Sequence, residues 1–552
     1  MAIYEDSRDA LLQAAKDGSL DELTALLAKC GCIDAKDDVG RTPLYIAASK
    51  GHIELVRELL AQSNVNAQTR EGATPLLIAC QYGHVNVVQL LVDCADVNIA
   101  ANDGVTPLFM AAQVGSLEIA RLLLEKKADA TKAMHNGATP IVVAAQNGHA
   151  AMVQLLLPHA RPTVAMDGGA TALLLATQHG HQDVVRALLD AVNDVDIPLS
   201  DGTTPLLLAC AKGELAIVEL LLVKADLKKT RQDGATALAL AAQYGHTAVV
   251  DLLLAQGNWS LDAVTSALLL AAQHGHMAVF KQLSTFSPKS LHHTIEDGTS
   301  ALIVAAACGQ TAIVDLLLAA DVDLLAATKT GATALMVATE HGHVGLVTTL
   351  LPKYPSTAAT MRNGATLLHI AAQNGHMALV DVFLPLTDVD AETLDGTTPL
   401  MLAAAKGHGH VVRSLIKAGA NVNIISDAQS FALLAAASHG HADVVSQLVD
   451  AGASVQQATD DRATSLIVAA AKGHAKCVEV LLAHGASIDH TMKDGSSALF
   501  VAAASGHLDV VRQLLQAGAN AHQAMKGGMT PLTVAEQCHH HEVGALLIKH
   551  GV

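Results

Sequence analysis

Short apolar runs alternate with single glycines along the whole chain, and the spacing of the apolar residues is helical. In residues 42–60, Leu44, Ala47 and Ala48 share one face of a short predicted helix that ends at Gly51. Residues 53–60 carry apolar side chains at helical spacing and predict a second helix. Neither helix reaches the ~12–15 residues at which isolated helices become marginally stable. Each pair of helices must therefore bury its apolar face against a neighbouring pair.

This two-helix pattern recurs along the chain in about 17 copies with a period of roughly 33 residues. Each copy has one position, the threonine slot, that precedes the first helix and suits an N-cap residue followed by proline or alanine. The slot is occupied by Asp9 in an atypical first copy and then by Thr42, Thr74, Thr106, Thr139, Thr171, Thr204, Thr236, Ser266, Ser300, Thr333, Thr366, Thr398, Phe431, Thr464, Ser497 and Thr530. A glycine ends the first helix of every copy except the last, which has His539 at this turn.

The repeating Thr-Pro-Leu, turn-glycine and Gly-His positions resemble those of ankyrin repeats, and the resemblance covers nearly the whole chain. It implies an all-α fold, an ankyrin-repeat α-solenoid in which each repeat is helix-turn-helix plus a β-hairpin-like finger, stacked into a curved superhelix. The family's histidine after Thr-Pro-Leu is present only at His369.

The pattern is weakest at Gly257 to Thr265, where the Asp-Gly turn is missing and Trp259 stands in its place. The following repeat is also irregular, with Pro288 in its second half. We therefore expect two continuous arrays, residues 5–258 with a capping first repeat and residues 259–552, with a bend at 257–293.

Composition narrows the class of partner. The formal net charge is −18, which disfavours nucleic acid as the main partner because such binding requires a basic surface. Hydrophobic residues make up 51% of the chain, yet no apolar run approaches the ~18–20 residues of a membrane-spanning helix. The N-terminus has no signal-peptide pattern. We expect a monomeric cytoplasmic protein, also compatible with the nucleus.

Histidine is the most prominent candidate for chemistry, with 29 residues and five His-Gly-His triplets. No carboxylate or cysteine lies at a fixed metal-ligand spacing from them, and eight scattered cysteines predict free, mostly buried thiols. We therefore expect the Gly-His histidines to bridge turns by hydrogen bonds, with no metal site and no cofactor. No catalytic motif is recognisable, so we expect no enzyme.

Two surfaces are candidates for binding partners. In ankyrin-like stacks the end of the first helix lines the concave groove, and here it carries a row of glutamines with Tyr, His, Asn and Lys neighbours. This polar row consists of Gln81, Tyr82, Gln113, Gln146, Asn147, Gln178, His179, Lys212, Gln243, Tyr244, Gln273, His274, Glu340, His341, Gln373, Asn374, Lys406 and Lys472. Such side chains suit protein recognition, but they are equally compatible with a solvated helix face or with bonds between repeats.

The finger tips form the second surface. Their Arg and Lys residues, among them Arg70, Arg231 and Lys329, are predicted to contact a partner. The Asp and Asn residues directly before the turn glycines, such as Asp103 and Asn136, are expected to serve ordinary turn geometry.

These observations predict a scaffold or adaptor that binds partner proteins or extended peptides along its concave groove and finger tips. Two alternatives belong to other classes. The chain could be the targeting arm of a larger channel or kinase, or an enzyme whose site is assembled across repeats.

Overall fold

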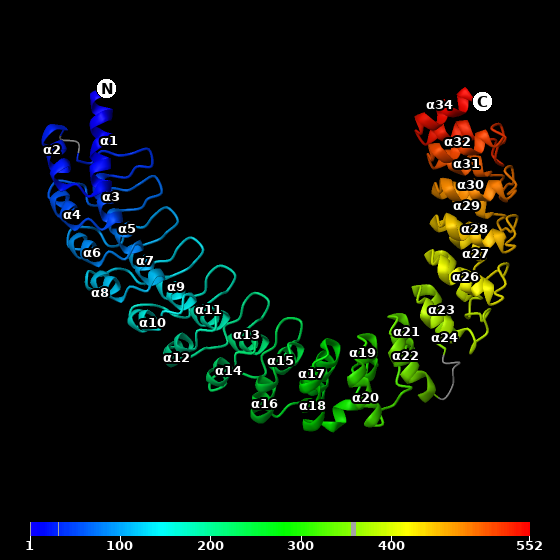
Figure 1. Ribbon diagram of the computed structural model, residues 1–552, viewed down its shortest axis with the longest axis horizontal. Helices are drawn as coiled ribbons and strands as arrows, with labels where there is room; N and C mark the ends of the chain where they lie inside the picture. The colour runs from blue at the N-terminus through cyan, green and yellow to red at the C-terminus, as the bar shows by residue number, and fades with distance from the viewer. Residues whose placement is uncertain (1, 31–32, 355–359, 552) are drawn as a thin grey trace. The chain divides into compact units, whose positions relative to one another are not determined.

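The computed structural model describes residues 2–30, 33–354 and 360–551, which form 34 α-helices in consecutive pairs (Figure 1). Odd-numbered helices are the first helices of the repeats and even-numbered helices are the second. Two short 3₁₀ helices, η1 (Pro288–Leu291) and η2 (Leu351–Lys353), follow α18 and α22. The described residues contain no β-sheet, only isolated bridges such as Ala327 with Thr333. The predicted all-α repeat architecture is confirmed.

The first helices are α1 (Ala2–Asp17), α3 (Pro43–Lys50), α5 (Pro75–Gln81), α7 (Pro107–Val114), α9 (Pro140–Gln146), α11 (Ala172–Gln178), α13 (Pro205–Lys212), α15 (Ala237–Gln243), α17 (Leu261–His274), α19 (Ala301–Ala307), α21 (Ala334–Glu340), α23 (Leu367–Asn374), α25 (Pro399–Lys406), α27 (Ala432–His439), α29 (Ser465–Lys472), α31 (Ala498–Ala504) and α33 (Pro531–Gln537). The second helices are α2 (Leu20–Cys30), α4 (Ile53–Leu60), α6 (Val85–Leu91), α8 (Leu117–Glu125), α10 (Ala150–Leu156), α12 (Gln182–Ala191), α14 (Leu215–Leu221), α16 (Thr247–Gln256), α18 (Met277–Phe286), α20 (Thr311–Ala319), α22 (Val344–Leu350), α24 (Met377–Phe383), α26 (Gly409–Lys417), α28 (Ala442–Asp450), α30 (Ala475–Ala483), α32 (Leu508–Gln516) and α34 (His541–Lys549).

Contacts divide the chain into two compact units, residues 1–271 with 278–286 and residues 272–277 with 287–552. Within each unit a first helix packs on its own second helix and on the first helix of the next repeat, while second helices pack on second helices. In the first unit the fingers extend from the side of the first helices (Figure 1). The predicted division into arrays at residue 258, with a bend at 257–293, stays a prediction.

Small residues allow the layers to pack closely. In α3, Ala47 and Ala48 are completely buried, and in α4 Val56 and Leu59 are completely buried. The same pattern of buried alanines in first helices and buried Val and Leu in second helices recurs in α9 and α10. The high proportion of apolar residues is thus explained by the interfaces that each thin layer forms on both of its sides.

The threonine slot caps the first helix as the sequence predicts. Thr42 has extended backbone angles and its hydroxyl accepts a hydrogen bond from the backbone N–H of Tyr45, with Pro43 at the first helical position. Equivalent caps are made by Thr74, Thr106, Thr171, Thr204, Thr236, Ser300, Thr398, Thr464, Ser497 and Thr530.

Two positions assigned to the threonine slot are wrong. Asp9 lies inside α1, which already begins at Ala2, and Ser266 lies inside α17, which begins at Leu261. In both places no turn glycine or proline precedes the slot, so nothing in the local sequence stops the helix from extending toward the N-terminus. The slot at Phe431 does begin a helix but provides no side-chain cap.

The histidine after the turn glycine connects consecutive repeats. Its Nε2 donates to the backbone carbonyl oxygen two residues before the turn glycine of the preceding repeat, because a carbonyl can only accept. His181, for example, donates to Gln146 O at 2.9 Å. The same bond, at 2.8–3.2 Å, is made by His52, His84, His149, His246, His343, His376, His408, His441, His474, His507 and His540. The predicted bridging role of these histidines is confirmed, and it satisfies carbonyls that a helix C-terminus leaves unpaired.

The histidine ring also explains why the turn needs glycine. Gly148 has φ +78°, and a Cβ built on it would lie 2.7 Å from Nδ1 of His181. Glycine is therefore required here twice, for its left-handed conformation and for the space that the ring of the next repeat occupies. Gly83 has φ +72° but no atom within 4 Å of such a Cβ, because Ser116 follows the turn glycine of the next repeat.

The difference between Gly83 and Gly148 predicts that their substitution by alanine affects stability unequally. Gly83→Ala should lower the free energy of unfolding by about 1–2 kcal/mol, the cost of a left-handed residue with a side chain. Gly148→Ala should cost about 1–3 kcal/mol more, because the methyl group overlaps the His181 ring. Urea unfolding followed by circular dichroism measures both variants, and equal losses would contradict the steric role of the ring.

Among the residues that the structure describes, His369 is the one histidine buried in the interior of a repeat. Its Nδ1 accepts from the backbone N–H of Thr366 at 3.1 Å and its Nε2 donates to Thr397 O at 3.0 Å, in the next repeat. The side chain is completely buried. Burial lowers the pKa of His369 below its ordinary value of 6.5, so the ring is neutral in the folded protein.

Because the folded-state pKa is the lower one, the unfolded chain takes up the proton first as the pH falls. The stability contributed by His369 is fully present above about pH 6.5 and is lost as the pH decreases from there toward the folded-state pKa. Wild type should therefore lose more unfolding free energy between pH 7.5 and pH 5.5 than His369→Gln, by at most about 1.4 kcal/mol per pH unit. His522→Gln, an exposed position, is the control, and parallel pH profiles of wild type and His369→Gln would refute the assignment.

Candidate functional site

The fingers are held in register by their backbones. Arg70 N donates to Val39 O of the preceding finger at 2.9 Å, and Asn102 N donates to Glu71 O at 2.9 Å. Similar bonds join later fingers within each unit, such as Gln232 N to Asp201 O and Lys493 N to Asp461 O. The finger tips are therefore a regular series of side chains on a fixed support.

The Asn and Asp residues of the tips serve the turns, as the sequence predicts. Asp103 Oδ1 accepts from Val105 N at 3.0 Å, and Asn136 Oδ1 accepts from Ala138 N at 3.0 Å. Asn102 Nδ2 instead donates to Arg70 O of the preceding finger at 2.8 Å. The exposed side chain of Arg70 forms no ion pair with the described residues, so its guanidinium is available to a partner.

One hollow in the first unit brings finger tips and first helices together. This finger hollow has a volume of about 500 Å³ and lies between α3, α5, α7 and the tips of two fingers. Its lining residues are Tyr45, Arg70, Glu71, Ala73, Leu77, Gln81, Ala101, Asn102, Asp103, Val105 and Met110. It is the place where the two candidate surfaces, the polar row and the finger tips, meet.

The finger hollow combines an apolar floor with free polar groups. Leu77 and Val105 are buried, while Arg70, Glu71 and Gln81 are exposed at its rim and their side chains make no hydrogen bond within the described part of the chain. Burial raises the pKa of Tyr45, so its hydroxyl remains a hydrogen-bond donor at neutral pH. This combination can bind an extended backbone through the polar rim and an apolar side chain on the floor.

The polar row lies at the C-terminal ends of the first helices, and all of its residues are exposed except Gln243, which is half-buried. The side chains of Gln81, Gln113, Gln146 and Gln178 make no hydrogen bond within the described residues. Tyr82 and Tyr244 lie against the bridging rings of His84 and His246, with centroids 6.1 and 6.3 Å apart. The two tyrosines thus present rigid, solvent-facing aromatic surfaces in the first unit.

Some residues of the row are engaged within the protein. Asn147 Nδ2 donates to Gln113 O at 3.0 Å and Lys212 Nζ donates to Gln178 O at 2.6 Å, so both bond to the preceding repeat. Asn374 and His341 bond to carbonyls of their own helices. For these four residues the structure favours a structural role over partner contact.

Only Gln81 of the polar row lines the finger hollow. Most of the floor of the finger hollow was not predicted from the sequence. It is formed by Tyr45, Leu77, Val105 and Met110. Tyr45 occupies the position where the family has histidine after Thr-Pro-Leu, and this departure was the available signal.

The described residues contain no group of three or more His, Cys, Asp or Glu side chains that could hold a metal ion. In the triplets, His181, His343 and His441 are bridging residues, and each stacks on the first histidine of its triplet at 6.0–6.2 Å. Cys80, Cys210 and Cys477 are free and buried, whereas Cys94, Cys308 and Cys538 are free and exposed. Burial raises the pKa of Cys210 to about 12 and that of Cys477 to about 11, which keeps both thiols protonated and unreactive.

The family model "Ankyrin repeats (3 copies)" matches eight overlapping segments, residues 2–69, 51–134, 128–201, 192–263, 268–360, 354–426, 424–492 and 484–552. The chain belongs to the ankyrin-repeat family. Ankyrin repeats generally mediate protein–protein interaction and are typically non-enzymatic. No individual curated protein matches the sequence. None of the described helices is both long and apolar enough to cross a membrane.

Proposed function

We propose that this ankyrin-repeat protein is a scaffold or adaptor that binds a partner protein or extended peptide along the first-helix and finger side of its repeats. The observation that carries the proposal is the finger hollow, where unpaired Arg70, Glu71 and Gln81 surround an apolar floor. The exposed Tyr82 and Tyr244, supported by histidine rings, supply aromatic anchors on the same side.

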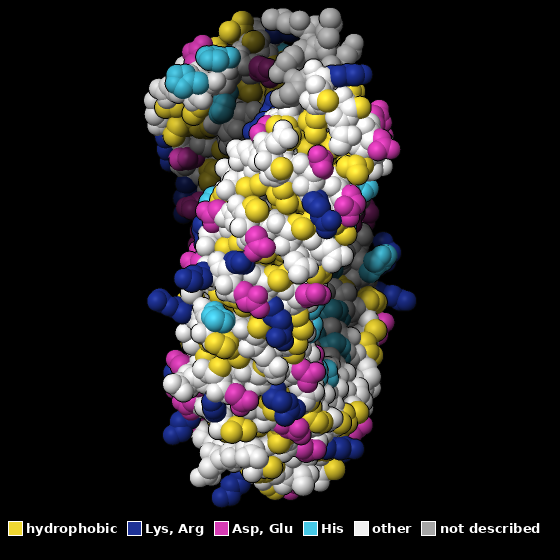
Figure 2. All heavy atoms as spheres, turned by 90° about the vertical axis from the view of Figure 1, so that its left-hand side faces the viewer, with side chains coloured by type: hydrophobic (Ala, Val, Ile, Leu, Met, Phe, Trp, Pro, Cys, Tyr) yellow, Lys and Arg dark blue, Asp and Glu magenta, His cyan; other side chains and the backbone are white. Residues whose placement is uncertain are grey.

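The charge distribution supports a protein partner over nucleic acid. On the face that Figure 2 shows, Lys and Arg side chains are scattered among Asp and Glu rather than gathered into a basic surface. The net charge of −18 points the same way. We propose a monomer that acts in the cytoplasm or nucleus.

The test is capture of partners from cell lysate on immobilised protein, with quantitative mass spectrometry. The Tyr82→Ala and Tyr244→Ala double variant should reduce recovery of at least one partner about tenfold, since each exposed aromatic anchor contributes on the order of 1 kcal/mol. Gln89→Ala with Glu219→Ala, exposed positions on second helices, is the matched control and should leave recovery unchanged. An identical partner profile for wild type and the tyrosine variant would remove the polar row from the binding surface.

A photo-crosslinking residue at Gln81 adds a direct readout of the finger hollow. It should form adducts with the same partners, whereas the same group at Gln89 should not. Adducts only from position 89 would place binding on the second helices instead.

A further inference from the structure

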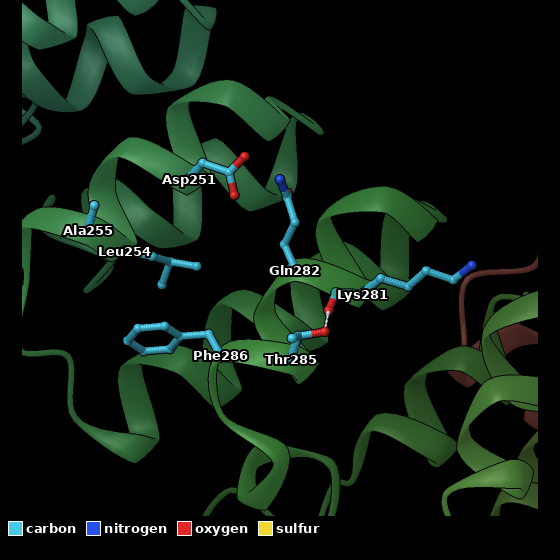
Figure 3. Close-up of a pocket in the computed structure, with 7 residues that line it drawn as sticks. All are labelled: Asp251, Leu254, Ala255, Lys281, Gln282, Thr285 and Phe286. Atoms are coloured by element: carbon cyan, nitrogen blue, oxygen red, sulfur yellow. Dashed lines mark hydrogen bonds between the residues drawn. The ribbon is translucent and has the colours of Figure 1, made fainter.

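A second hollow, independent of the finger hollow, lies on the second-helix side of the first unit. It has a volume of about 510 Å³ and is lined by Asp251, Leu254 and Ala255 of α16 and by Lys281, Gln282, Thr285 and Phe286 of α18. Figure 3 shows the Phe286 ring directed toward Leu254 and Ala255, with the Asp251 carboxylate at the other end. We call it the outer hollow.

Three other repeats place a lysine or a histidine here that reaches the preceding repeat, whereas repeats with Cys94, Ala191, Ala320 or Leu386 at this position do not. Lys126, Lys224 and His484 each stand ten residues after the position that follows the turn glycine, as Phe286 does. Lys126 forms an ion pair with Asp93 of the preceding repeat at 2.7 Å, and His484 lies 3.6 Å from Asp450. Lys224 Nζ donates to the carbonyls of Leu189 and Val192 in the preceding repeat.

At α16 and α18 both members of that bridge are apolar. Ala255 occupies the position of Asp93 and Asp450, and Phe286 occupies the position of Lys126 and His484. Phe286 is 47% exposed, which leaves a large aromatic ring facing solvent at the position where Lys126, Lys224 and His484 reach the preceding repeat. Exposed aromatic surface in the lining of a hollow is typical of a binding anchor.

The polar groups of the outer hollow specify what can cover this ring. Asp251 is exposed and has no ion pair in the described part of the chain. The side chain of Lys281, which also lines the hollow, extends away from Asp251 in Figure 3. Gln282 Nε2 donates to Thr247 O at 3.3 Å, which holds the wall of the hollow in place.

We propose that the outer hollow binds a partner helix that presents an apolar side chain to Phe286 and, one turn away, a lysine or arginine to Asp251. The spacing follows from α16, where Asp251 and Ala255 lie four residues apart and so are separated by one helical turn. An amphipathic helix with such a pair satisfies the apolar surface and the free carboxylate together. The protein would then have two docking surfaces, one on each side of its layers.

The probe is a fluorescein-labelled, alanine-based helical peptide of about 18 residues with Leu and Arg four residues apart on one face. Two matched peptides replace Arg by Glu or Leu by Ala. Fluorescence anisotropy with the full chain should give a Kd on the order of 10 µM for the Leu/Arg peptide and at least about tenfold weaker binding for the other two.

Three variants locate the site. Phe286→Lys, which introduces the residue found at Lys126, Lys224 and Lys353, should weaken binding about tenfold while leaving the thermal unfolding temperature within a few degrees. Asp251→Lys should reverse the preference so that the Glu peptide binds more tightly than the Arg peptide. Val223→Lys, at an 81% exposed position of the same side, is the control and should bind like wild type.

The Tyr82→Ala and Tyr244→Ala double variant should also bind the peptide like wild type, so failure of the first-helix surface does not affect this test. No binding at about 1 mM, equal affinity for the Arg and Glu peptides, or wild-type affinity in Phe286→Lys would overturn the proposal. Phe286-dependent binding to anionic lipid vesicles without peptide binding would overturn it too, in favour of a membrane surface.

Discussion

The contact between a histidine ring and the turn glycine of the preceding repeat is the interaction on which the stack depends. It joins two requirements at one place, because the imidazole both bonds to a helix-terminal carbonyl and fills the space above a residue without a side chain. A typical hydrogen bond of this kind contributes only about 1 kcal/mol. Repeated along the chain, it couples layers that are too thin to fold alone.

This coupling also determines which surfaces are left for partners. The first helices end at the histidine bridge, so the residues just before the turn glycine are held in a fixed position and yet face solvent. Tyr82 and Tyr244 stack on bridging rings, which limits their motion and lowers the entropy cost of using them as anchors. On the second-helix side, Lys126 and Lys224 join neighbouring repeats, whereas the corresponding place at α16 and α18 holds the apolar residues Ala255 and Phe286.

Much of the fold was predictable because each repeat contains residues that mark where its helices begin and end. Thr42, Pro43 and Gly51 mark the start and end of a helix by local chemistry, and the same chemistry recurs at fixed spacing. The prediction was wrong at Asp9 and Ser266, where no glycine or proline precedes the slot and the helix extends through it. In an irregular segment the spacing of the repeat therefore does not predict where a helix begins.

The candidate sites were less predictable, because a hollow depends on side chains from several repeats. Gln81 and Arg70 were found as members of two separate surfaces, but their meeting around Tyr45 and Met110 follows only from the packing of α3, α5 and α7. Phe286 had only a weak sequence signal, since its repeat position holds Lys126 and Lys224 but also Ala191 and Leu386. The structure adds that both lysines bond to the preceding repeat and that Phe286 cannot form such a bond.

The most direct test of the histidine–glycine contact is a double-mutant cycle of Gly148→Ala with His181→Ala, measured by urea unfolding. If the ring occupies the space above Gly148, the double variant should be more stable than the sum of the single losses predicts, with a coupling of at least about 0.5 kcal/mol. Strict additivity of the two losses would show that the ring and the glycine act independently and would contradict the account.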